Sequence, residues 1–229
     1  MGKVTCISGI DTDIGKTEAT GLLARSLLGQ GHSVITQKAV QTGCSGVADD
    51  ILRHRELMGV DLLIEDKEGI TCPYVFARPC SPHLAAELEQ SHIDPERITM
   101  ATETLAARFD HVLLEGAGGL LVPLSRKLTL LDYLEERGYP LILVTSPRLG
   151  SINHTLSALE LAKKRNLEVK GIIYNLAFAT DPDIVRDSRR FFVDSLERYG
   201  FAPLVVDLER TETYLEQGTD FPCLQLFGN

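Results

Sequence analysis

The 229-residue sequence lacks the patterns that mark several classes of protein. Its five cysteines include no C-x-x-C pair and no Cys/His cluster, so neither a zinc site nor a disulfide framework is indicated. It has no basic leader and no long apolar stretch, which argues against a secretory signal or a membrane span and predicts a cytoplasmic protein. Basic residues are outnumbered, with 23 Lys and Arg against 32 Asp and Glu and a net charge of −9. Because no basic face is available to displace phosphate counterions, we expect no nucleic-acid partner.

The chain also lacks internal repeats, low-complexity tracts and linkers. Hydrophobic residues make up 44% and charged residues 24% of it, which are ordinary values for a globular protein. A length of 229 residues suffices for one well-buried α/β domain and is short for two. We therefore expect residues 1–229 to form a single domain.

Short apolar runs alternate along the chain with longer segments of helical periodicity. The runs are nearly continuous in apolar and β-branched residues, as buried parallel strands are, and predict strands at residues 4–8, 33–37, 111–114, 141–145 and 169–174. Helices are predicted at about residues 16–30, 47–58, 94–108, 129–137, 151–165 and 182–199. The proline-containing residues 60–92 predict a loop and a short helix over one end of the sheet. This order predicts an α/β fold of the P-loop NTPase type, a doubly wound, mainly parallel sheet with helices on both faces.

A phosphate-binding loop is predicted at residues 9–17, GIDTDIGKT, which follow a predicted strand and open a predicted helix. Gly9 and Gly15 are expected to adopt backbone conformations closed to other residues, so that successive N–H groups face a phosphate. The helix start adds its positive dipole end. Lys16 would contact the β- and γ-phosphate oxygens, and Thr17 would ligate Mg²⁺. The loop has one residue more than the standard pattern, and a purely structural glycine turn is the alternative interpretation.

Other polar residues stand at the carboxyl ends of predicted strands, where ligands bind in open α/β sheets. Glu115 precedes the glycine-rich residues 116–119 and is a candidate Mg²⁺ ligand, with an ordinary acid at a helix N-terminus as the alternative. Lys38 is expected to face the same edge of the sheet, unless it is a strand-end lysine that extends into water. Asp49 and Asp50 begin a predicted helix, where N-capping is the alternative to metal binding.

Together these residues resemble the ATP-dependent dethiobiotin synthetase family. The resemblance extends from the first strand to about residue 175. The segments that carry it are GIDTDIGKT at residues 9–17, KAVQTG at 38–43, SPH at 81–83, EGAGG at 115–119, PL at 123–124 and LGSINH at 149–154. The extra residue in the phosphate loop is typical of this family and so supports the resemblance.

The resemblance implies a homodimeric cyclo-ligase that uses ATP and Mg²⁺ to carboxylate 7,8-diaminopelargonate with CO₂ and close a cyclic urea, in biotin synthesis. An amine and CO₂ form a carbamate, the carbamate oxygen takes the γ-phosphoryl group of ATP, and the second amine expels phosphate. By position, Thr17, Asp50 and Glu115 would hold the metal, with Asp49 left open as an alternative to Asp50. Lys16 and Lys38 would be the catalytic cations.

The resemblance also implies sets of binding residues. The nucleotide would be bound by Asp13, Ile14, Gly15, Lys16, Thr17, Glu18, Asp50, Glu115, Gly118 and Asn175, the last facing adenine. The substrate would be bound by Thr12, Thr42, Gly150, Ser151, Ile152 and Asn153. Residues 149–154 follow a strand and start a helix, so their free N–H groups would bind the substrate carboxylate across the dimer interface. Residues 205–208 are only a loose counterpart of the family's adenine loop, which leaves the choice among ATP, CTP and GTP open.

Three alternatives share the phosphate loop. A partner-regulated ATPase switch of the ParA/MinD type usually carries an additional lysine near the loop start, where this chain has Ile10 and Asp11. Cobyrinic acid amide ligases are much longer and add a glutaminase domain. A small GTPase is disfavoured because the sequence has no Asn-Lys-x-Asp motif.

Overall fold

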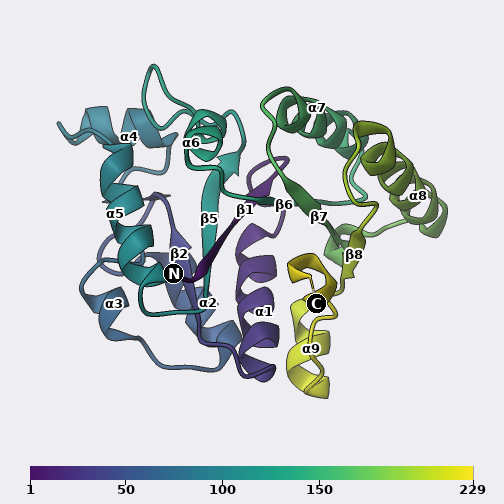
Figure 1. The fold of residues 1–229 in the computed structure, drawn as a ribbon, viewed down its shortest axis with the longest axis horizontal. Helices are drawn as coiled ribbons and strands as arrows, with labels where there is room; N and C mark the ends of the chain where they lie inside the picture. The colour runs from purple at the N-terminus through teal and green to yellow at the C-terminus, as the bar shows by residue number, and fades with distance from the viewer. Residues whose placement is uncertain (229) are drawn as a thin grey trace.

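A computed structural model describes residues 1–228, in which a six-stranded sheet lies between two layers of helices (Figure 1). The strand order is β2-β5-β1-β6-β7-β8, and every neighbouring pair is parallel. The strands are β1 (Lys3–Gly9), β2 (Val34–Lys38), β5 (His111–Gly119), β6 (Leu141–Thr145), β7 (Val169–Asn175) and β8 (Val205–Leu208). The predicted fold class is confirmed.

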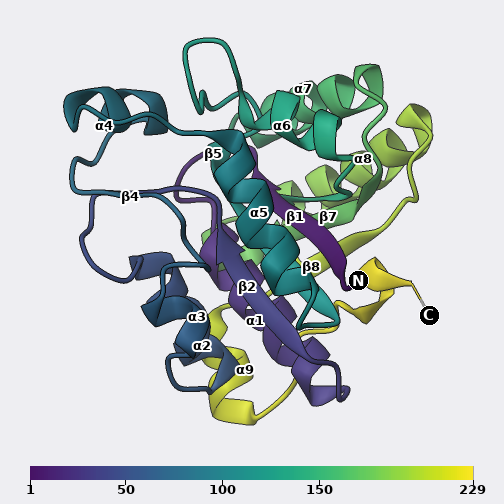
Figure 2. The same ribbon diagram turned by 60° about the vertical axis from the view of Figure 1, so that its left-hand side comes forward.

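Successive residues of the central strands point into two separate cores. In β1, Cys6 belongs to one core and Ile7 to the other, and in β5 Leu114 and Leu113 divide in the same way. One side of the sheet carries α1 (Lys16–Gly29), α2 (Asp49–Met58) and α9 (Thr211–Gln217). The other side carries α5 (Pro95–Ala106), α6 (Leu130–Arg137), α7 (Ser151–Lys164) and α8 (Pro182–Tyr199) (Figures 1 and 2). Because both faces are covered, the strands are apolar throughout instead of alternating.

The structure extends the predicted elements at two places. β5 continues through Glu115 to Gly119, so the EGAGG segment lies within the strand instead of following it. Residues 205–208 form β8, the edge strand beside β7, and α9 follows them. β8 has only four residues, one of them Asp207, and a run this short has no readable periodicity.

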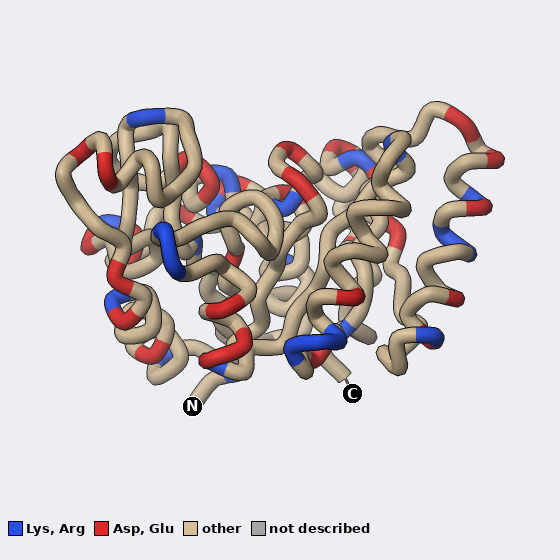
Figure 3. Tube along the Cα trace, turned by 90° about the horizontal axis from the view of Figure 1, so that it is seen from above, with Lys and Arg blue, Asp and Glu red and all other residues tan. Residues whose placement is uncertain are grey.

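The irregular segment over residues 60–92 contains more structure than predicted. It holds the short helices α3 (Ile64–Lys67) and α4 (Pro82–Leu88), and its strand β4 (Val75–Phe76) pairs with β3 (Gln41–Thr42). Two 3₁₀ turns, η1 (Leu176–Phe178) and η2 (Leu224–Phe227), complete the described elements. Within residues 1–228, no helix combines the length and apolar character needed to cross a membrane. Acidic and basic residues are interspersed along the helices in Figure 3.

Helix α2 is held against the sheet by a buried ion pair. Arg55 donates to both carboxylate oxygens of Asp66 at 2.8 Å, and to the hydroxyl of Thr36 in β2 at 2.8 Å. The side chains of Arg55 and Asp66 are only 3% and 0% exposed. Burial raises the pKa of Asp66, but the hydrogen bonds and charge of Arg55 outweigh burial and hold this pKa below its ordinary value. The ion pair therefore fixes α2, and the residues that α2 carries, relative to β2 and α3.

Helices α1 and α2 also pack closely where α1 has a glycine. A Cβ on Gly21 would lie 2.6 Å from Cδ1 and 2.8 Å from Cβ of Leu57, closer than carbon atoms pack. A glycine inside a helix costs about 1 kcal/mol relative to alanine. Its place here is explained by the close contact with Leu57, in the last turn of α2.

We predict that Arg55→Leu lowers the free energy of unfolding by about 3–5 kcal/mol, because it leaves the Asp66 carboxylate buried without its cation. The loss is expected to be full near neutral pH. It should shrink below about pH 4, where the carboxylate is protonated in the unfolded chain. Denaturant unfolding at several pH values measures both effects.

The control for this experiment is Arg126→Ala, which breaks the exposed pair with Glu87. An exposed pair contributes less than about 1 kcal/mol, so the control should unfold much like the wild type. Equal losses in the two variants would contradict a special role for the buried pair.

Candidate functional site

The phosphate loop leaves the carboxyl end of β1 and enters α1, as predicted. Its first part is tied to the sheet by Ile10, whose N–H donates to the carbonyl of Val144 in β6 at 3.1 Å. Lys16 lies across the loop and donates from Nζ to the carbonyl oxygen of Asp11 at 2.8 Å. Burial and, next, the charge of Lys38 lower the pKa of Lys16 to about 8. The Lys16 ammonium is therefore held within the loop, where a phosphate group would lie.

The two glycines of the loop serve different purposes. Gly15 has φ 94°, as predicted, and Asp13 is also left-handed with φ 52°. Gly9 was also expected to adopt a backbone conformation closed to other residues, but its φ is not positive. A Cβ on Gly9 would lie 2.6 Å from Cγ2 of Ile14, so this position is restricted by space.

Asn175, at the end of β7, supports the backbone of the loop. Its Nδ2 donates to the carbonyl of Ile14 at 2.9 Å, and its Oδ1 accepts from the N–H of Ala177 at 3.0 Å. A Cβ on Gly15 would lie 2.1 Å from this Nδ2. The Asn175 side chain is thus packed directly against the loop, and its contact with adenine stays a prediction.

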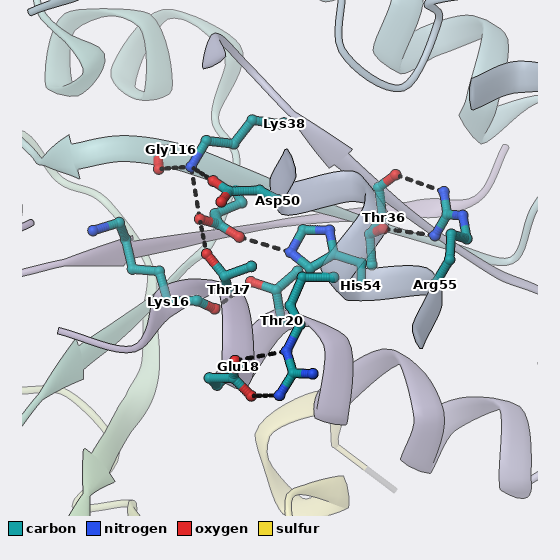
Figure 4. A network of polar contacts seen from close by, with 12 residues as sticks. Lys16, Thr17, Glu18, Thr20, Thr36, Lys38, Asp50, His54, Arg55 and Gly116 are labelled. Atoms are coloured by element: carbon teal, nitrogen blue, oxygen red, sulfur yellow. Dashed lines mark hydrogen bonds and ion pairs between the residues drawn. The ribbon is translucent and has the colours of Figure 1, made fainter. Parts of the chain in front are cut away.

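Lys38, Asp50 and Glu115 meet beside the loop (Figure 4). The Nζ of Lys38 lies 2.5 Å from Oδ2 of Asp50, 2.7 Å from Oε1 of Glu115 and 3.3 Å from the carbonyl oxygen of Gly116. Thr17 at the start of α1 donates its hydroxyl to the same Oε1 at 3.1 Å. The structure therefore brings together residues from four separate segments: the loop, two predicted strand ends and a helix start.

These contacts decide several of the alternatives. Lys38 is 5% exposed, so it is not a strand-end lysine that extends into water. Glu115 is fully buried within β5 and is not an acid at a helix N-terminus. The N-cap of α2 is Ala48 and no side chain caps it, so the N-capping interpretation of Asp49 and Asp50 was wrong. Of these two residues, Asp50 is the one that contacts Lys38.

The electrostatics of this cluster keep both charges in place. Burial alone lowers the pKa of Lys38, but the carboxylates of Glu115 and Asp50 outweigh it and raise this pKa above the ordinary value. Burial alone raises the pKa of Glu115, but the charge of Lys38 and the hydrogen bond from His54 hold it well below its usual range. Lys38 is therefore a fixed cation and Glu115 a fixed anion.

His54 is the residue of the site that the sequence predictions missed. It lies on α2, one helical turn after Asp50, and its Nε2 is 2.8 Å from Oε2 of Glu115. The available signal was the spacing of four residues, which places Asp50 and His54 on one face of a helix. That spacing does not reveal Glu115, which is 61 residues further along the chain than His54.

Glu18 links three helices at the base of the loop. Its carboxylate accepts from Arg53 of α2 at 2.9 and 3.1 Å and from the hydroxyl of Thr211 in α9 at 2.6 Å. Neither partner was predicted, because Arg53 and Thr211 are 35 and 193 residues away. The nucleotide contact expected of Glu18 stays a prediction.

The proposed substrate residues are distributed over three segments. Thr12 is exposed at the tip of the phosphate loop, and a Cβ on Gly118 would lie 3.7 Å from its hydroxyl, so the loop tip and the end of β5 are neighbours. Thr42 is half-buried in β3. At the start of α7, Gly150 is the N-cap, Ser151 is buried, Ile152 is half-buried and Asn153 is exposed. The predicted strand-to-helix position of this segment is confirmed, and its substrate contacts stay predictions.

The donor set around Lys38 fits a magnesium ion. Thr17, Asp50 and Glu115 supply hydroxyl and carboxylate oxygens, the ligands that Mg²⁺ prefers. Two of the three already surround one cation, the Lys38 ammonium, and the third donates to Glu115. The cluster also adjoins the loop that would hold the phosphates, which are the usual remaining ligands of Mg²⁺.

We predict that Gly15→Ala weakens binding of Mg-ATP at least about tenfold, because a methyl group cannot fit between the loop and Asn175 and a left-handed alanine is strained. Isothermal titration calorimetry with a non-hydrolysable ATP analogue measures the affinity. The matched control is Gly31→Ala, which has a similar φ of 86° but no atom of residues 1–228 within 4 Å of the added Cβ. Both variants strain a left-handed backbone, but only Gly15→Ala adds a clash, so an equal loss of nucleotide affinity in both would contradict the packing argument.

The chain is similar to a family model and to named proteins over most of its length. Residues 3–214 match the family model described as an AAA domain. The chain is 55% identical over 199 residues to the ATP-dependent dethiobiotin synthetase BioD 2 of Pasteurella multocida (strain Pm70), covering 87% of this chain and 93% of that protein. It is 51% identical over 219 residues to the ATP-dependent dethiobiotin synthetase BioD of Chlorobaculum tepidum, covering 95% of this chain and 91% of that protein.

A solved structure shares the fold at much lower identity. The ParA family ATPase from Chlorobium tepidum TLS superposes with a TM-score of 0.55 and 16% identity, over 99% of this chain and 88% of that chain. At that identity the likeness concerns the fold alone, whereas the synthetases match at more than half of the aligned positions. The chain therefore belongs to the ATP-dependent dethiobiotin synthetase family.

Proposed function

We propose that this protein is a cyclo-ligase that converts 7,8-diaminopelargonate, CO₂ and ATP to dethiobiotin, ADP and phosphate, a reaction of biotin synthesis. The observation that carries the proposal is the cluster of Lys38, Asp50 and Glu115 beside Thr17, at the head of a phosphate loop. The names of the close relatives support it.

The reaction requires a poor leaving group to be made into a good one. One substrate amine attacks CO₂ and forms a carbamate. A carbamate oxygen then attacks the γ-phosphorus of ATP, and ADP leaves. The second amine attacks the carbamoyl carbon, phosphate leaves with its C–O bond broken, and the cyclic urea is complete. Negative charge builds on the phosphoryl and carbamate oxygens, so the site needs cations at fixed positions.

The two lysines would supply this charge in different ways. Lys38 is held by two carboxylates, and its raised pKa keeps it protonated, so it would act as a fixed cation and not as a base. The ammonium of Lys16 donates to a loop carbonyl. When a nucleotide binds, this ammonium would turn to the β- and γ-phosphate oxygens. Thr17, Asp50 and Glu115 would hold Mg²⁺, which supplies positive charge to the phosphate oxygens when bound.

We place the substrate between the tip of the phosphate loop and a second copy of the chain. Leu149, two residues before α7, is fully exposed, and the N-terminus of α7 offers free N–H groups to the substrate carboxylate. The proposal is a homodimer that works on small molecules in the cytoplasm, without a nucleic-acid or membrane partner.

We expect purified protein to form dethiobiotin, ADP and phosphate in equal amounts from 7,8-diaminopelargonate, bicarbonate and Mg-ATP. Mass spectrometry and a coupled ADP assay measure the products, and reactions without the diamine are the control. We expect ATP to be preferred when CTP and GTP replace it. ATP hydrolysis that needs no diamine and yields no dethiobiotin would contradict the proposal and favour a ParA-like switch.

We predict that Lys38→Ala lowers kcat by about 100-fold or more while Mg-ATP still binds, because a cation that stabilises developing charge is removed. Steady-state rates and calorimetry with a non-hydrolysable ATP analogue separate the two effects. Lys164→Ala, at an exposed lysine at the end of α7, is the control and should keep the wild-type rate. A wild-type rate in Lys38→Ala would remove Lys38 from the mechanism.

A further inference from the structure

The side chain of His54 is sealed inside the protein beside the proposed metal site. It is 0% exposed, as is that of Glu115, and the two are joined between Nε2 and Oε2 at 2.8 Å. Lys38 and Thr17 both donate to the other oxygen of this carboxylate, Oε1. An ionised carboxylate only accepts hydrogen bonds, so the Nε2 of His54 carries the hydrogen and donates it.

The contacts of Glu115 divide unequally between its two oxygens. Oε1 accepts from both Lys38 and Thr17, whereas His54 bonds to Oε2. Without His54, Oε2 would lose this donor inside a sealed environment, which is unfavourable for a charged oxygen. The carboxylate would also lose the side-chain contact that restrains it on the side of Oε2. His54 therefore sets the rotation of the carboxylate plane.

A role in packing alone does not account for this histidine. Its Nδ1 is buried and has no hydrogen-bond partner among residues 1–228, and an apolar side chain would avoid that cost. The compensation is the charge-assisted hydrogen bond to Glu115, which is stronger than a bond between neutral groups. Asp50 lies one turn earlier on α2, so the same helix supplies one proposed ligand of the metal and the support for another.

We propose that His54 is a positioning residue that orients the carboxylate of Glu115 toward the magnesium ion of the bound nucleotide. The inference rests on the proposed Mg-nucleotide site and adds to it a residue that touches neither the metal nor the substrate. Groups that hydrogen-bond metal ligands typically change metal affinity by about 10- to 100-fold when they are removed.

The test compares His54→Asn with His54→Gln. Glutamine extends an N–H₂ donor about as far as Nε2 of histidine, whereas the amide of asparagine ends near Nδ1, so both variants are polar and only one reaches Glu115. The measurement is calorimetric titration of Mg²⁺ into protein saturated with a non-hydrolysable ATP analogue. We expect Mg²⁺ affinity to fall about 10- to 100-fold in His54→Asn and to stay within a few-fold of wild type in His54→Gln.

Two further measurements separate positioning from general damage. Binding of the analogue in EDTA, and the KM for 7,8-diaminopelargonate, should be unchanged in both variants. His111→Asn is the matched control, because His111 is also a buried histidine with an unpartnered Nδ1 in the described chain, and it lies at the start of β5, four residues before Glu115. This control should not alter Mg²⁺ affinity.

The outcomes distinguish this inference from the proposed function. Equal Mg²⁺ affinities in the Asn and Gln variants, whether both normal or both weak, would overturn the positioning role. An absence of Mg²⁺-dependent nucleotide binding in the wild type would instead overturn the proposed metal site.

Discussion

The buried carboxylate of Glu115 is the point on which the arrangement of this molecule depends. An isolated charge in a sealed interior is strongly unfavourable, so the surroundings must supply donors and a counter-charge. They come from three elements besides β5: Lys38 at the end of β2, Thr17 at the start of α1 and His54 on α2. The stability of one ionised side chain thus requires the same convergence of strand ends and helix starts that the proposed chemistry requires.

The parallel sheet makes this convergence possible. β5 lies between β2 and β1, with Glu115 in register with Lys38 on one side and with Ile7 on the other. The phosphate loop leaves β1 two residues beyond Ile7, so it begins beside the carboxylate. On the outer side, the buried pair of Arg55 with Asp66 fixes α2, which carries Asp50 and His54. Interactions away from the site therefore determine its geometry.

Two lysines near the proposed phosphate position show how burial and neighbours select a role. Lys38 sits between two carboxylates, which overcome the effect of burial and raise its pKa. Lys16 is also buried but is bonded to a carbonyl, and burial with the repulsion of Lys38 lowers its pKa to about 8. The same residue type thus provides a cation with a fixed charge at Lys38 and a cation that loses its proton more easily at Lys16. The ParA-like fold by itself specifies neither, since function depends on such side chains and not on the sheet that carries them.

The sequence by itself determined the loop, the five longer strands and the main helices, because local periodicity and glycine placement encode them. It also identified Lys38, Thr17 and Glu115 through their positions at strand ends and in the loop. Only the tertiary structure decided the strand order, the role of residues 205–208 as a sixth strand, the contact of Asp50 instead of Asp49 with Lys38, and the part played by His54. The reason is physical: a local pattern shows which face of an element is buried, but the partner that satisfies a buried polar group lies far along the chain. His54 and Glu115 are 61 residues apart, and only packing of α2 against β2 and β5 brings them into contact.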